Sequence, residues 1–385
     1  MAPFRWIMAF EYYVRSGQEK LRMGYTTGTC AALAAKAACE VIFSGTVPET
    51  VSVLTPKGIT VEVEPHACEV IEPGRKARVC IIKDAGDDAD VTNGTEVWSE
   101  VTLTDTEGIV IDGGEGVGRV TKAGLDQPVG NAAINSGPRS QITAAVAEMI
   151  KSYEHPGGAT VIVSIPAGKE LAKHTFNPII GIEGGISVLG TSGIVEPMSE
   201  AALVATIDVT MKQARLESDR LIITPGNYGE NFIENGPLGT PTCPVVKSSN
   251  FIGETLDMAA LYGFKEVILI GHIGKIVKVA AGVMNTHSKY ADGRNEVFCA
   301  HAAVHGASRS QCERLMNAAT TDACIEILDE TGIRGEVMAS ITDAVQRHLD
   351  IRVRDRYICG AVLFSNVYST LGITDKAKQL MEVWK

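Results

Sequence analysis

Alternation of apolar and polar residues predicts strands in the first half of the chain. The pattern occurs over residues 51–64, 76–86 and 100–114, and all three stretches contain several β-branched residues. Pro56–Gly58 is expected to turn the first stretch back on itself. Glu107–Gly108 is expected to turn the third stretch back on itself, so residues 100–114 are predicted to form a hairpin.

Helical patterns complete this half of the chain. An alanine-rich run that ends at Gly45 predicts a helix, with Thr26, Thr27 and Thr29 as candidate N-cap residues. A second helix is expected over 140–153, followed by an apolar strand. About the first 180 residues are therefore expected to form a mixed sheet with helices packed on it.

The pattern changes after Gly181, where short apolar strands alternate with helical stretches. Strands are expected at 186–190, 221–226 and 266–271, and helices at 199–218, 250–264 and 272–285. Strand and helix in alternation at this spacing are typical of βαβ units on a parallel sheet. The tail is expected to be helical over 310–330 and 336–349, with a late strand at 357–366.

These elements predict an α/β protein with α+β character in its N-terminal half. We expect a mixed-sheet N-terminal domain and a Rossmann-like parallel-sheet domain. The expected ranges are an N-terminal extension at 1–20, a mixed α/β domain at 21–183, and a Rossmann-like α/β domain with a helical C-terminal part at 184–385.

Composition narrows the class of protein. The chain of 385 residues has 35 Lys and Arg against 46 Asp and Glu, a net charge of −11, which argues against a nucleic-acid binder. No apolar run approaches the length of a membrane-spanning helix, and the N-terminus lacks the pattern of a signal peptide. Nine scattered cysteines without a CxxC pair indicate reduced thiols. We therefore expect a cytoplasmic protein without a membrane or nucleic-acid partner.

Three glycine-containing turns follow the expected strands of the second half. In a parallel sheet such turns meet at one edge, where ligands of open α/β sheets bind, and helix N-termini there attract anions. None of the turns matches a P-loop or dinucleotide signature. The turns comprise Gly190, Thr191, Ser192 and Gly193; Gly226, Asn227 and Tyr228; and Gly271, His272, Gly274 and Lys275.

The segment Asp84–Asp90 places four carboxylates within seven positions. Crowded carboxylates repel one another, so one of them can have a raised pKa and act as an acid or base. Asp87 and Asp88 are the candidates for this role. An acidic surface turn with local hydrogen bonds explains the same residues equally well, and the spacing does not fit a calcium loop.

Several polar residues of the second half are further candidates. His272 stands at a strand–helix turn beside Lys275, where it could contact a ligand or transfer a proton. Arg294 offers a planar fork for a carboxylate. The loop Asn285, Thr286 and His287 suggests the wall of an active site or an ordinary surface loop. His301 and His305 have metal-ligand spacing but no third ligand.

Several of these motifs together resemble the CbiD family, the cobalt-precorrin-5B (C1)-methyltransferases of anaerobic cobalamin biosynthesis. The resemblance runs in order from about Leu21 to the C-terminus, and its most specific parts are GYTTGTCAA and GHIGKIVKVAAGVMNTHS. The other matching segments are Asp84–Asp88, Gly114–Gly118, Gly190–Val195 and Asn250–Gly253.

The resemblance implies S-adenosylmethionine as methyl donor and a cobalt-containing corrinoid as substrate, methylated at C1 to give cobalt-precorrin-6A. Cobalt then arrives in the substrate, and no protein-bound metal is expected. Together with the position of the glycine-containing turns at the strand ends, the resemblance assigns Asp87, Asp88 and His272 to catalysis. Cofactor binding is assigned to Gly190, Thr191, Ser192, Gly193, Gly226, Asn227, Tyr228, Gly271 and Gly274. Substrate binding is assigned to Thr26, Thr27, Thr29, Lys275, Asn285, Thr286, His287 and Arg294.

Two other functions stay open at this point. An isomerase or hydrolase of another carboxylate-rich or phosphorylated metabolite would use the same anion-binding turns. A non-catalytic tetrapyrrole carrier would bind the corrinoid without turnover. A homo-oligomer and transient contacts with neighbouring pathway enzymes are compatible with the sequence.

Overall fold

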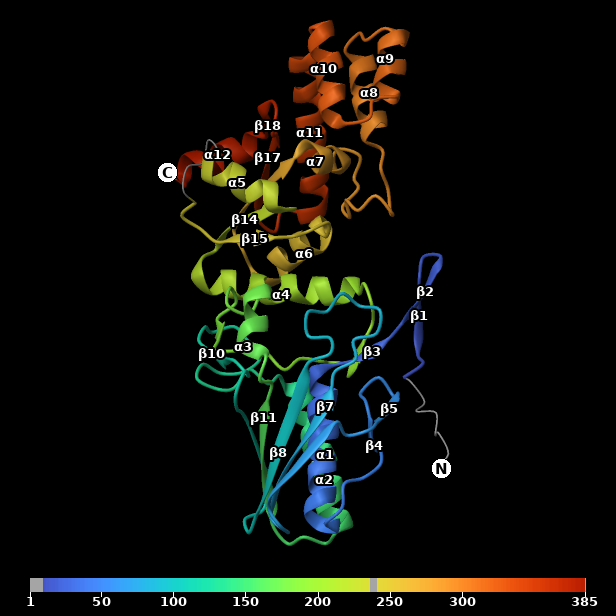
Figure 1. Ribbon diagram of the computed structural model, residues 1–385. Helices are drawn as coiled ribbons and strands as arrows, with labels where there is room; N and C mark the ends of the chain where they lie inside the picture. Colours follow the sequence, from blue (N-terminus) through green and yellow to red (C-terminus); the bar gives the residue numbers. More distant parts are fainter. Residues whose placement is uncertain (1–9, 236–240, 385) are drawn as a thin grey trace. The chain divides into compact units, whose positions relative to one another are not determined.

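The computed structural model describes residues 10–235 and 241–384, which form parts of two compact units, Met1–Glu200 and Ala201–Lys385 (Figure 1). The division lies after the expected boundary at residue 183, so residues 184–200 belong with the first unit. Hydrogen bonds explain this difference, because the strand Ile194–Val195 pairs with the strand Gly24–Tyr25. Residues 1–9 of the expected extension lie outside the described residues.

The first unit contains a five-stranded sheet with the order β6-β7-β8-β11-β9. All neighbours are antiparallel except β11 and β9, which are parallel. The predicted hairpin at 100–114 is therefore wrong, because β11 lies between its two strands. Alternation determines which face of a sheet a residue occupies, but not which strand lies beside it. The strands are β6 (Ala67–Glu72), β7 (Lys76–Ile82), β8 (Glu96–Thr104), β9 (Ile109–Gly113) and β11 (Gly158–Ser164).

Two long helices pack on this sheet, and α1 (Thr27–Ser44) contacts both β7 and β8 as well as α2 (Ser136–Ser152) (Figure 1). Most residues of α1 are buried, and its alanines allow this because they are small and favour helix. The Thr26 side chain caps the helix, and Gly45 ends it in the left-handed conformation. The predicted alanine-rich helix and its caps are confirmed.

Short pairs of strands complete the first unit. β4 and β5 form the antiparallel pair expected within residues 51–64, and β1 pairs with β2 near the N-terminus. The elements are β1 (Tyr13–Ser16), β2 (Glu19–Arg22), β3 (Gly24–Tyr25), β4 (Val51–Leu54), β5 (Thr60–Val63), β10 (Arg119–Val120), β12 (Ile182–Glu183), β13 (Ile194–Val195), α3 (Gly168–Leu171) and the 3-10 helix η1 (Ala172–His174).

The second unit is built on a five-stranded sheet with the order β15-β14-β16-β17-β18. The first four strands are parallel, and β18 runs antiparallel at the edge. In chain order this arrangement is 2-1-3-4-5, which differs from the dinucleotide-binding order 3-2-1-4-5-6. The α/β class is confirmed, and the Rossmann-like description is not. The strands are β14 (Arg220–Thr224), β15 (Val245–Lys247), β16 (Glu266–His272), β17 (Ile358–Ser365) and β18 (Ser369–Ile373).

Helices cover both faces of this sheet. Alternate strand residues belong to two different cores, as Leu269 packs with α6 and α11 while Ile270 packs with α5 and α12. The expected helix at 310–330 is divided into α9 and α10, since Thr320 caps a new helix. The helices are α4 (Glu200–Glu217), α5 (Asn227–Asn235), α6 (Ile252–Tyr262), α7 (Ile273–Val279), α8 (Arg294–Val304), α9 (Arg309–Met316), α10 (Thr321–Thr331), α11 (Arg334–Val353) and α12 (Asp375–Val383).

The expected strand at 186–190 is not part of this second sheet. Its residues lie in the first unit, where Ile186 and Val188 form isolated bridges with Val117 and Ile134. The apolar pattern correctly predicted that the segment is buried, but burial alone does not identify the core to which a segment belongs.

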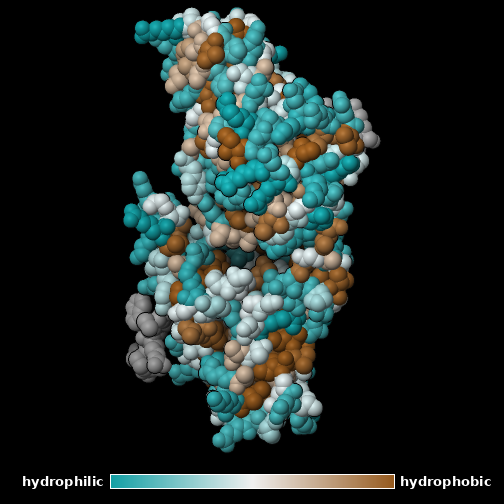
Figure 2. Space-filling view, turned by 180° about the vertical axis from the view of Figure 1, so that it is seen from behind, coloured by the Kyte–Doolittle hydropathy of each residue, from teal (hydrophilic) through white to brown (hydrophobic). Residues whose placement is uncertain are grey.

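The surface carries exposed apolar residues in both units. Leu54 and Met198 of the first unit and Leu261 and Val304 of the second are each more than two-thirds exposed. On the face drawn in Figure 2, apolar residues form separate patches among hydrophilic ones. Across 10–235 and 241–384, no helix combines the length and the apolar character needed to cross a membrane.

Candidate functional site

The carboxyl ends of β14 and β16 bring two of the three expected turns together. Pro225 and Gly226 follow β14, and His272 is the last residue of β16, its parallel neighbour. β14 and β16 are the first and third strands of the sheet, and helices on opposite faces follow them. This is a topological switch point, where open α/β sheets bind ligands.

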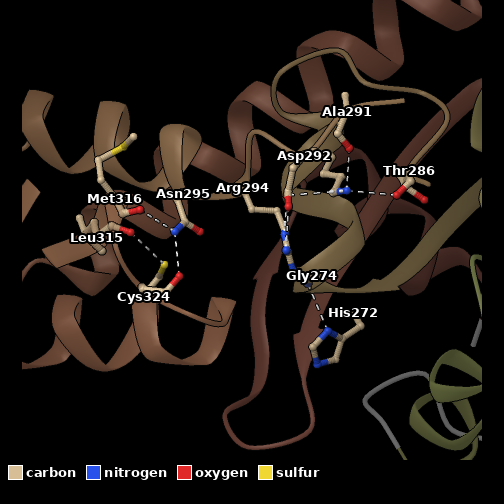
Figure 3. A network of polar contacts seen from close by, with 12 residues as sticks. His272, Gly274, Thr286, Ala291, Asp292, Arg294, Asn295, Leu315, Met316 and Cys324 are labelled. Atoms are coloured by element: carbon tan, nitrogen blue, oxygen red, sulfur yellow. Dashed lines mark hydrogen bonds and ion pairs between the residues drawn. The ribbon is translucent and has the colours of Figure 1, made fainter. Parts of the chain in front are cut away.

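His272 connects β16 to α7 and has a defined orientation. Its Nδ1 atom accepts a hydrogen bond of 3.2 Å from the backbone N–H of Gly274, so the side chain caps α7 (Figure 3). An Nδ1 atom that accepts a hydrogen bond is unprotonated, and the proton of the neutral ring then lies on Nε2. The exposed side of the imidazole therefore presents a donor.

The environment of His272 favours this neutral form. Burial lowers the pKa of the imidazole below its ordinary value, and the carboxylate of Asp322 only partly opposes the shift. A neutral His272 with Nδ1 engaged is suited to donate a hydrogen bond through Nε2. In this arrangement the side chain could transfer a proton only as a donor through Nε2, and the predicted catalytic role of His272 stays a prediction.

Lys275 extends from the first turn of α7 to the loop after β14. Its ammonium group donates to the carbonyl oxygen of Pro225 at 2.7 Å. Within the described part of the chain, no carboxylate forms an ion pair with it. Burial and the neighbouring cation Lys278 lower the pKa of Lys275. Among the described residues, the site thus holds a half-buried positive charge without a counter-ion.

Aromatic rings surround His272 on two sides. Phe364 lies edge-on to the imidazole at 5.6 Å between ring centroids, and Phe232 stacks on Phe364 at 4.1 Å. Tyr228 lies 6.0 Å from His272 and is 62% exposed. The buried Phe364, backed by the half-buried Phe232, holds the imidazole in place, while the Tyr228 ring offers a flat surface to a ligand.

The sequence-based candidates did not include Asp322 and Ser365. Ser365 ends β17, and its hydroxyl donates to the Asp322 carboxylate at 2.7 Å. Asp322 is in the first turn of α10, close enough to act on the charge of His272. A Thr-Thr-Asp sequence at a helix start and a Ser at a strand end could have suggested both residues.

Lys278 organises the loop that follows α7, and Figure 3 shows its contact residues Thr286, Ala291 and Asp292. Its side chain is almost fully buried, and the ammonium group donates to the carbonyl oxygens of Thr286 at 3.2 Å and Ala291 at 2.9 Å. The Asp292 carboxylate lies 3.7 Å away. The lysine therefore fastens both ends of the loop 286–291 to the helix.

The other polar residues of this loop form local contacts. Arg294 binds Asp292 through two hydrogen bonds of 2.6 and 2.8 Å, which hold the pKa of Asp292 down at about 2. The guanidinium group of Arg294, which we expected to bind a substrate carboxylate, is thus already bound to Asp292. Asn285 accepts from the backbone of His287, and the buried Thr286 contacts Asn250. Their predicted substrate contacts stay predictions.

In the first unit, the turn Thr26–Thr29, called here the threonine turn, binds the chain's own carbonyl groups. The buried hydroxyl of Thr29 donates to the carbonyl oxygen of Gly193 at 2.7 Å, and the N–H of Gly28 donates to that of Leu189. A Cβ atom on Gly190 would lie 2.2 Å from Thr26 Oγ1. The glycine is therefore needed for contact with the threonine turn, whereas we expected it to admit a ligand.

The remaining residues of these two motifs differ in exposure. Ser192 Oγ donates to the carbonyl oxygen of Ile194 at 2.9 Å, Thr27 is buried, and Thr191 is exposed. The turn at 190–193 lies in the first unit and is not part of the β14–β16 edge. The cofactor-binding argument for it, which relied on a shared sheet edge, is therefore wrong.

The acidic loop is neutralised by neighbouring cations. Asp84 forms two hydrogen bonds with Arg22, at 2.6 and 2.8 Å, and Asp90 binds the buried ammonium of Lys83 at 2.5 Å. Burial acts to raise the pKa of both carboxyls, but the hydrogen bonds and cations outweigh it and lower both. Repulsion within the loop therefore raises the pKa of neither carboxyl.

Asp87 and Asp88 lie in the same loop and accept backbone hydrogen bonds. Asp87 Oδ2 accepts from the N–H of Arg22 at 2.6 Å, and Asp88 Oδ1 accepts from that of Met198 at 3.0 Å. Both contacts lie within the first unit, whereas His272 and Lys275 lie in the second. Neither unit alone contains all the catalytic candidates, and the role of the two carboxylates stays a prediction.

Metal-ligating side chains are not clustered in the described ranges 10–235 and 241–384. No group of three or more His, Cys, Asp or Glu residues there could hold a metal ion. His301 contacts the hydroxyl of Ser340 at 2.8 Å, and all nine cysteines are free.

Comparisons with known proteins cover both units. The CbiD family model matches residues 14–197, and the CbiD C-terminal domain model matches 285–375. A protein from Ruminiclostridium cellulolyticum named cobalt-precorrin-5B C(1)-methyltransferase is 43% identical over 385 residues, covering 96% of this chain and 98% of the relative. One of the same name from Alkaliphilus metalliredigens is 39% identical, covering 97% of this chain and 98% of the relative.

A solved structure is also similar in sequence. The crystal structure of the cobalamin biosynthesis protein CbiD from Archaeoglobus fulgidus is 32% identical, covers 73% of this chain and 87% of its own, and has a TM-score of 0.38. The motif-based expectation of the family is confirmed by the sequence relatives, whose similarity extends over nearly the whole length of both chains. The chain belongs to the CbiD family.

Proposed function

We propose that the protein is an S-adenosylmethionine-dependent methyltransferase that methylates C1 of cobalt-precorrin-5B to give cobalt-precorrin-6A in anaerobic cobalamin biosynthesis. The observation that carries this proposal is the 43% identity with a cobalt-precorrin-5B C(1)-methyltransferase over 96% of the chain. Similarity of that extent spans both units, so it supports a shared reaction and substrate.

Methyl transfer from a sulfonium to a ring carbon breaks one carbon–sulfur bond and forms one carbon–carbon bond. The main task of the enzyme is then to align the sulfonium methyl group with C1, and alignment of this kind is worth about 7–11 kcal/mol of the barrier. The corrinoid carries acetate and propionate groups on its rim. Hydrogen-bond donors and cations that bind these groups would supply the alignment.

The β14–β16 edge has the chemistry that such ligands need. The Lys275 ammonium lacks a carboxylate partner among the described residues, His272 presents Nε2–H, and Tyr228 exposes a ring. A cation fits a carboxylate, and an aromatic ring fits an adenine or a macrocycle. Asp87 and Asp88 of the first unit are proposed to accept a proton or balance charge on the macrocycle.

The direct test is an anaerobic incubation of purified protein with cobalt-precorrin-5B and methyl-labelled S-adenosylmethionine. Mass spectrometry and carbon-13 NMR of the corrinoid should show one added methyl group, located at C1. Heat-denatured protein is the control for spontaneous transfer, and omission of S-adenosylmethionine is the control for the methyl source.

Two negative results would replace this function with another. Tight binding of the corrinoid without methylation by well-folded protein would indicate a tetrapyrrole carrier. Absence of both binding and transfer would point to an isomerase or hydrolase of a different anionic metabolite, which would not consume S-adenosylmethionine.

A further inference from the structure

We propose that Lys275 and His272 form a carboxylate-binding subsite at the carboxyl ends of β14 and β16, with the ammonium group and Nε2–H as its two donors. The inference rests on the proposed function and deepens it by naming the ligand group that this edge recognises. Its basis is the arrangement of these two side chains around the turn after β14.

The charge of Lys275 is only partly satisfied by the described residues. The described residues provide one hydrogen-bond acceptor for its ammonium group, the carbonyl oxygen of Pro225 at 2.7 Å. An ammonium has three donors, so two of them have no acceptor in the described part of the chain. The charge that acts on it is another cation, Lys278. Lys278 itself contacts Asp292, so the positive charge at Lys275 is left to attract an anion.

The Lys275 ammonium group lies beside the glycine of the turn after β14. Gly226 follows Pro225, and among the described residues a Cβ atom placed on it would have no neighbour nearer than Lys275 Nζ, at 4.0 Å. The ammonium group thus borders an open position in the turn. The helix α5 begins at the next residue, and the first N–H groups of a helix have no acceptors within it.

The His272 ring is held in one orientation beside the same turn. The hydrogen bond from Gly274 to Nδ1 fixes the tautomer and the orientation of the ring, and contact with Phe364 supports it. Tyr228, two residues after Gly226, lies beside the ring on the same turn. His272 and Lys275 therefore both border the 225–228 turn, and a carboxylate there can accept from both.

Two ligands could supply the carboxylate. One is the amino-acid part of S-adenosylmethionine, and the other is a peripheral acetate or propionate of the corrinoid. Both groups are carboxylates with the same charge and geometry, and the proposed subsite would accept either one. Binding experiments with matched probes can show whether the carboxylate comes from S-adenosylmethionine or from the corrinoid.

The experiment measures binding by the full-length protein and its Lys275→Met variant in isothermal titration calorimetry. The first pair of probes is S-adenosylmethionine and decarboxylated S-adenosylmethionine, which lacks only the carboxylate. The second pair is cobyrinic acid and a corrinoid in which the same side chains are amides. Lys275→Arg keeps the charge, and Lys265→Met, at an exposed position, controls for loss of a lysine elsewhere.

The expected result is selective weakening. Lys275→Met should bind the carboxylate member of one pair about 10–100-fold more weakly, which is typical for a lost hydrogen bond to a charged group. Its affinity for the carboxylate-free member should change less than about threefold. Lys275→Arg should retain most of the affinity. The pair that shows the difference identifies the source of the carboxylate.

His272→Asn gives an independent readout, because the Asn side chain can still cap α7 but cannot provide Nε2–H. It should weaken the same probe selectively while the thermal unfolding temperature stays near that of the wild type. Unselective weakening of both members of a pair by Lys275→Met would indicate a structural role and overturn the subsite. Unchanged affinity for all four probes would overturn it as well.

The methylation assay on wild-type protein keeps this test separate from the proposed function. Methyl transfer without carboxylate selectivity would overturn the subsite alone. Carboxylate selectivity without methyl transfer would overturn the methyltransferase function alone. Wild-type protein that binds none of the four probes would overturn both.

Discussion

The hydroxyl group of Thr29 lies 2.7 Å from the carbonyl oxygen of Gly193, although 164 residues separate the two in the chain. The N–H of Thr26 donates to the same carbonyl oxygen at 3.1 Å. The threonine motif at the start of α1 and the glycine motif near the end of the first unit are therefore two halves of one contact. Their specific sequences follow from this close packing.

Gly190→Ala should destabilise the first unit by about 2–4 kcal/mol, since a side chain at positive φ and a clash both add cost. Gly190 has φ +136, and an added Cβ would meet Thr26 Oγ1. Gly130→Ala is the matched control, because Gly130 has φ +92 and open space around it. The control should lose only about 1 kcal/mol. Urea denaturation of both variants tests this, and equal losses would contradict the packing argument.

Asp90→Asn should be more damaging than loss of an exposed ion pair. Lys83 is 2% exposed, and without the Asp90 charge its buried ammonium group would lose the carboxylate that it binds directly. Removal of one partner of a buried pair costs about 3–5 kcal/mol. Glu100→Gln, which breaks the more exposed pair with Lys76, should cost less than about 1 kcal/mol. The unfolding midpoints in urea measure both, and a similar small effect in the two variants would refute the prediction.

The ion pair of Asp90 and Lys83 should also make the folding stability of the protein sensitive to acid. The pKa of Asp90 is lower in the folded protein than its ordinary value. Its contribution to stability is therefore complete above about pH 4 and is lost as the pH falls through the folded-state pKa. Wild-type protein should lose stability more steeply than Asp90→Asn below about pH 4. Parallel acid curves for the two proteins would count against a role of this ion pair.

Lys278→Met should open the loop after α7 without unfolding the sheet. The substitution leaves the carbonyl oxygens of Thr286 and Ala291 without their buried donor. Amide hydrogen exchange in 285–292 should then become at least about tenfold faster, while exchange in β14 and β16 stays near the wild-type rate. Lys265→Met serves as the control, and unchanged exchange in the loop would show that Lys278 does not hold it.

His272 should act as a donor rather than as a base. Its pKa is lowered by burial, so the neutral form dominates above about pH 6.5, its ordinary pKa. If methyl transfer is the reaction, kcat/KM of the wild type should show no His272-dependent rise between pH 6.5 and pH 8. His272→Ala should lose about 1 kcal/mol of stability with its cap, unlike His272→Asn. A rise in rate that disappears in both variants would instead indicate a base.

Asp87→Asn and Asp88→Asn test the acidic loop as a catalytic element. Asn keeps an oxygen for the backbone contacts to Arg22 and Met198 but removes the charge. If one of the carboxylates is the base, its variant should fold normally and lose about 100-fold or more in turnover, in line with general-base catalysis. Wild-type turnover in both variants would exclude this role. Thermal unfolding of each variant provides the control for folding.

Local signals predicted the individual elements well. The alanine run with Thr26 before it and Gly45 after it fixed both ends of α1, because caps are determined by nearby residues. The short apolar stretches at β14 and β16 and the turns after them were also identified correctly. The sequence alone therefore predicts that His272 and Lys275 lie at a strand–helix turn.

Long-range pairing could not be predicted in this way. Nothing in residues 100–114 indicates that β11 lies between β8 and β9, since alternation carries no information on neighbours. The 186–190 segment was assigned to the wrong unit for the same reason. The pairing of Asp90 with Lys83 and the proximity of Asp322 to His272 also depend on tertiary structure.

The contact between the start and the end of the first unit also affects the order in which the protein can form during synthesis. When α1 leaves the ribosome, the residues that cover its N-terminus have not yet been translated. At bacterial-type elongation rates of about 5–20 residues per second, the 164-residue interval between Thr29 and Gly193 takes roughly 8–30 s. Throughout that interval the apolar surface of α1 lacks part of its native cover, so a chaperone that binds the nascent chain would find exposed apolar surface on this helix.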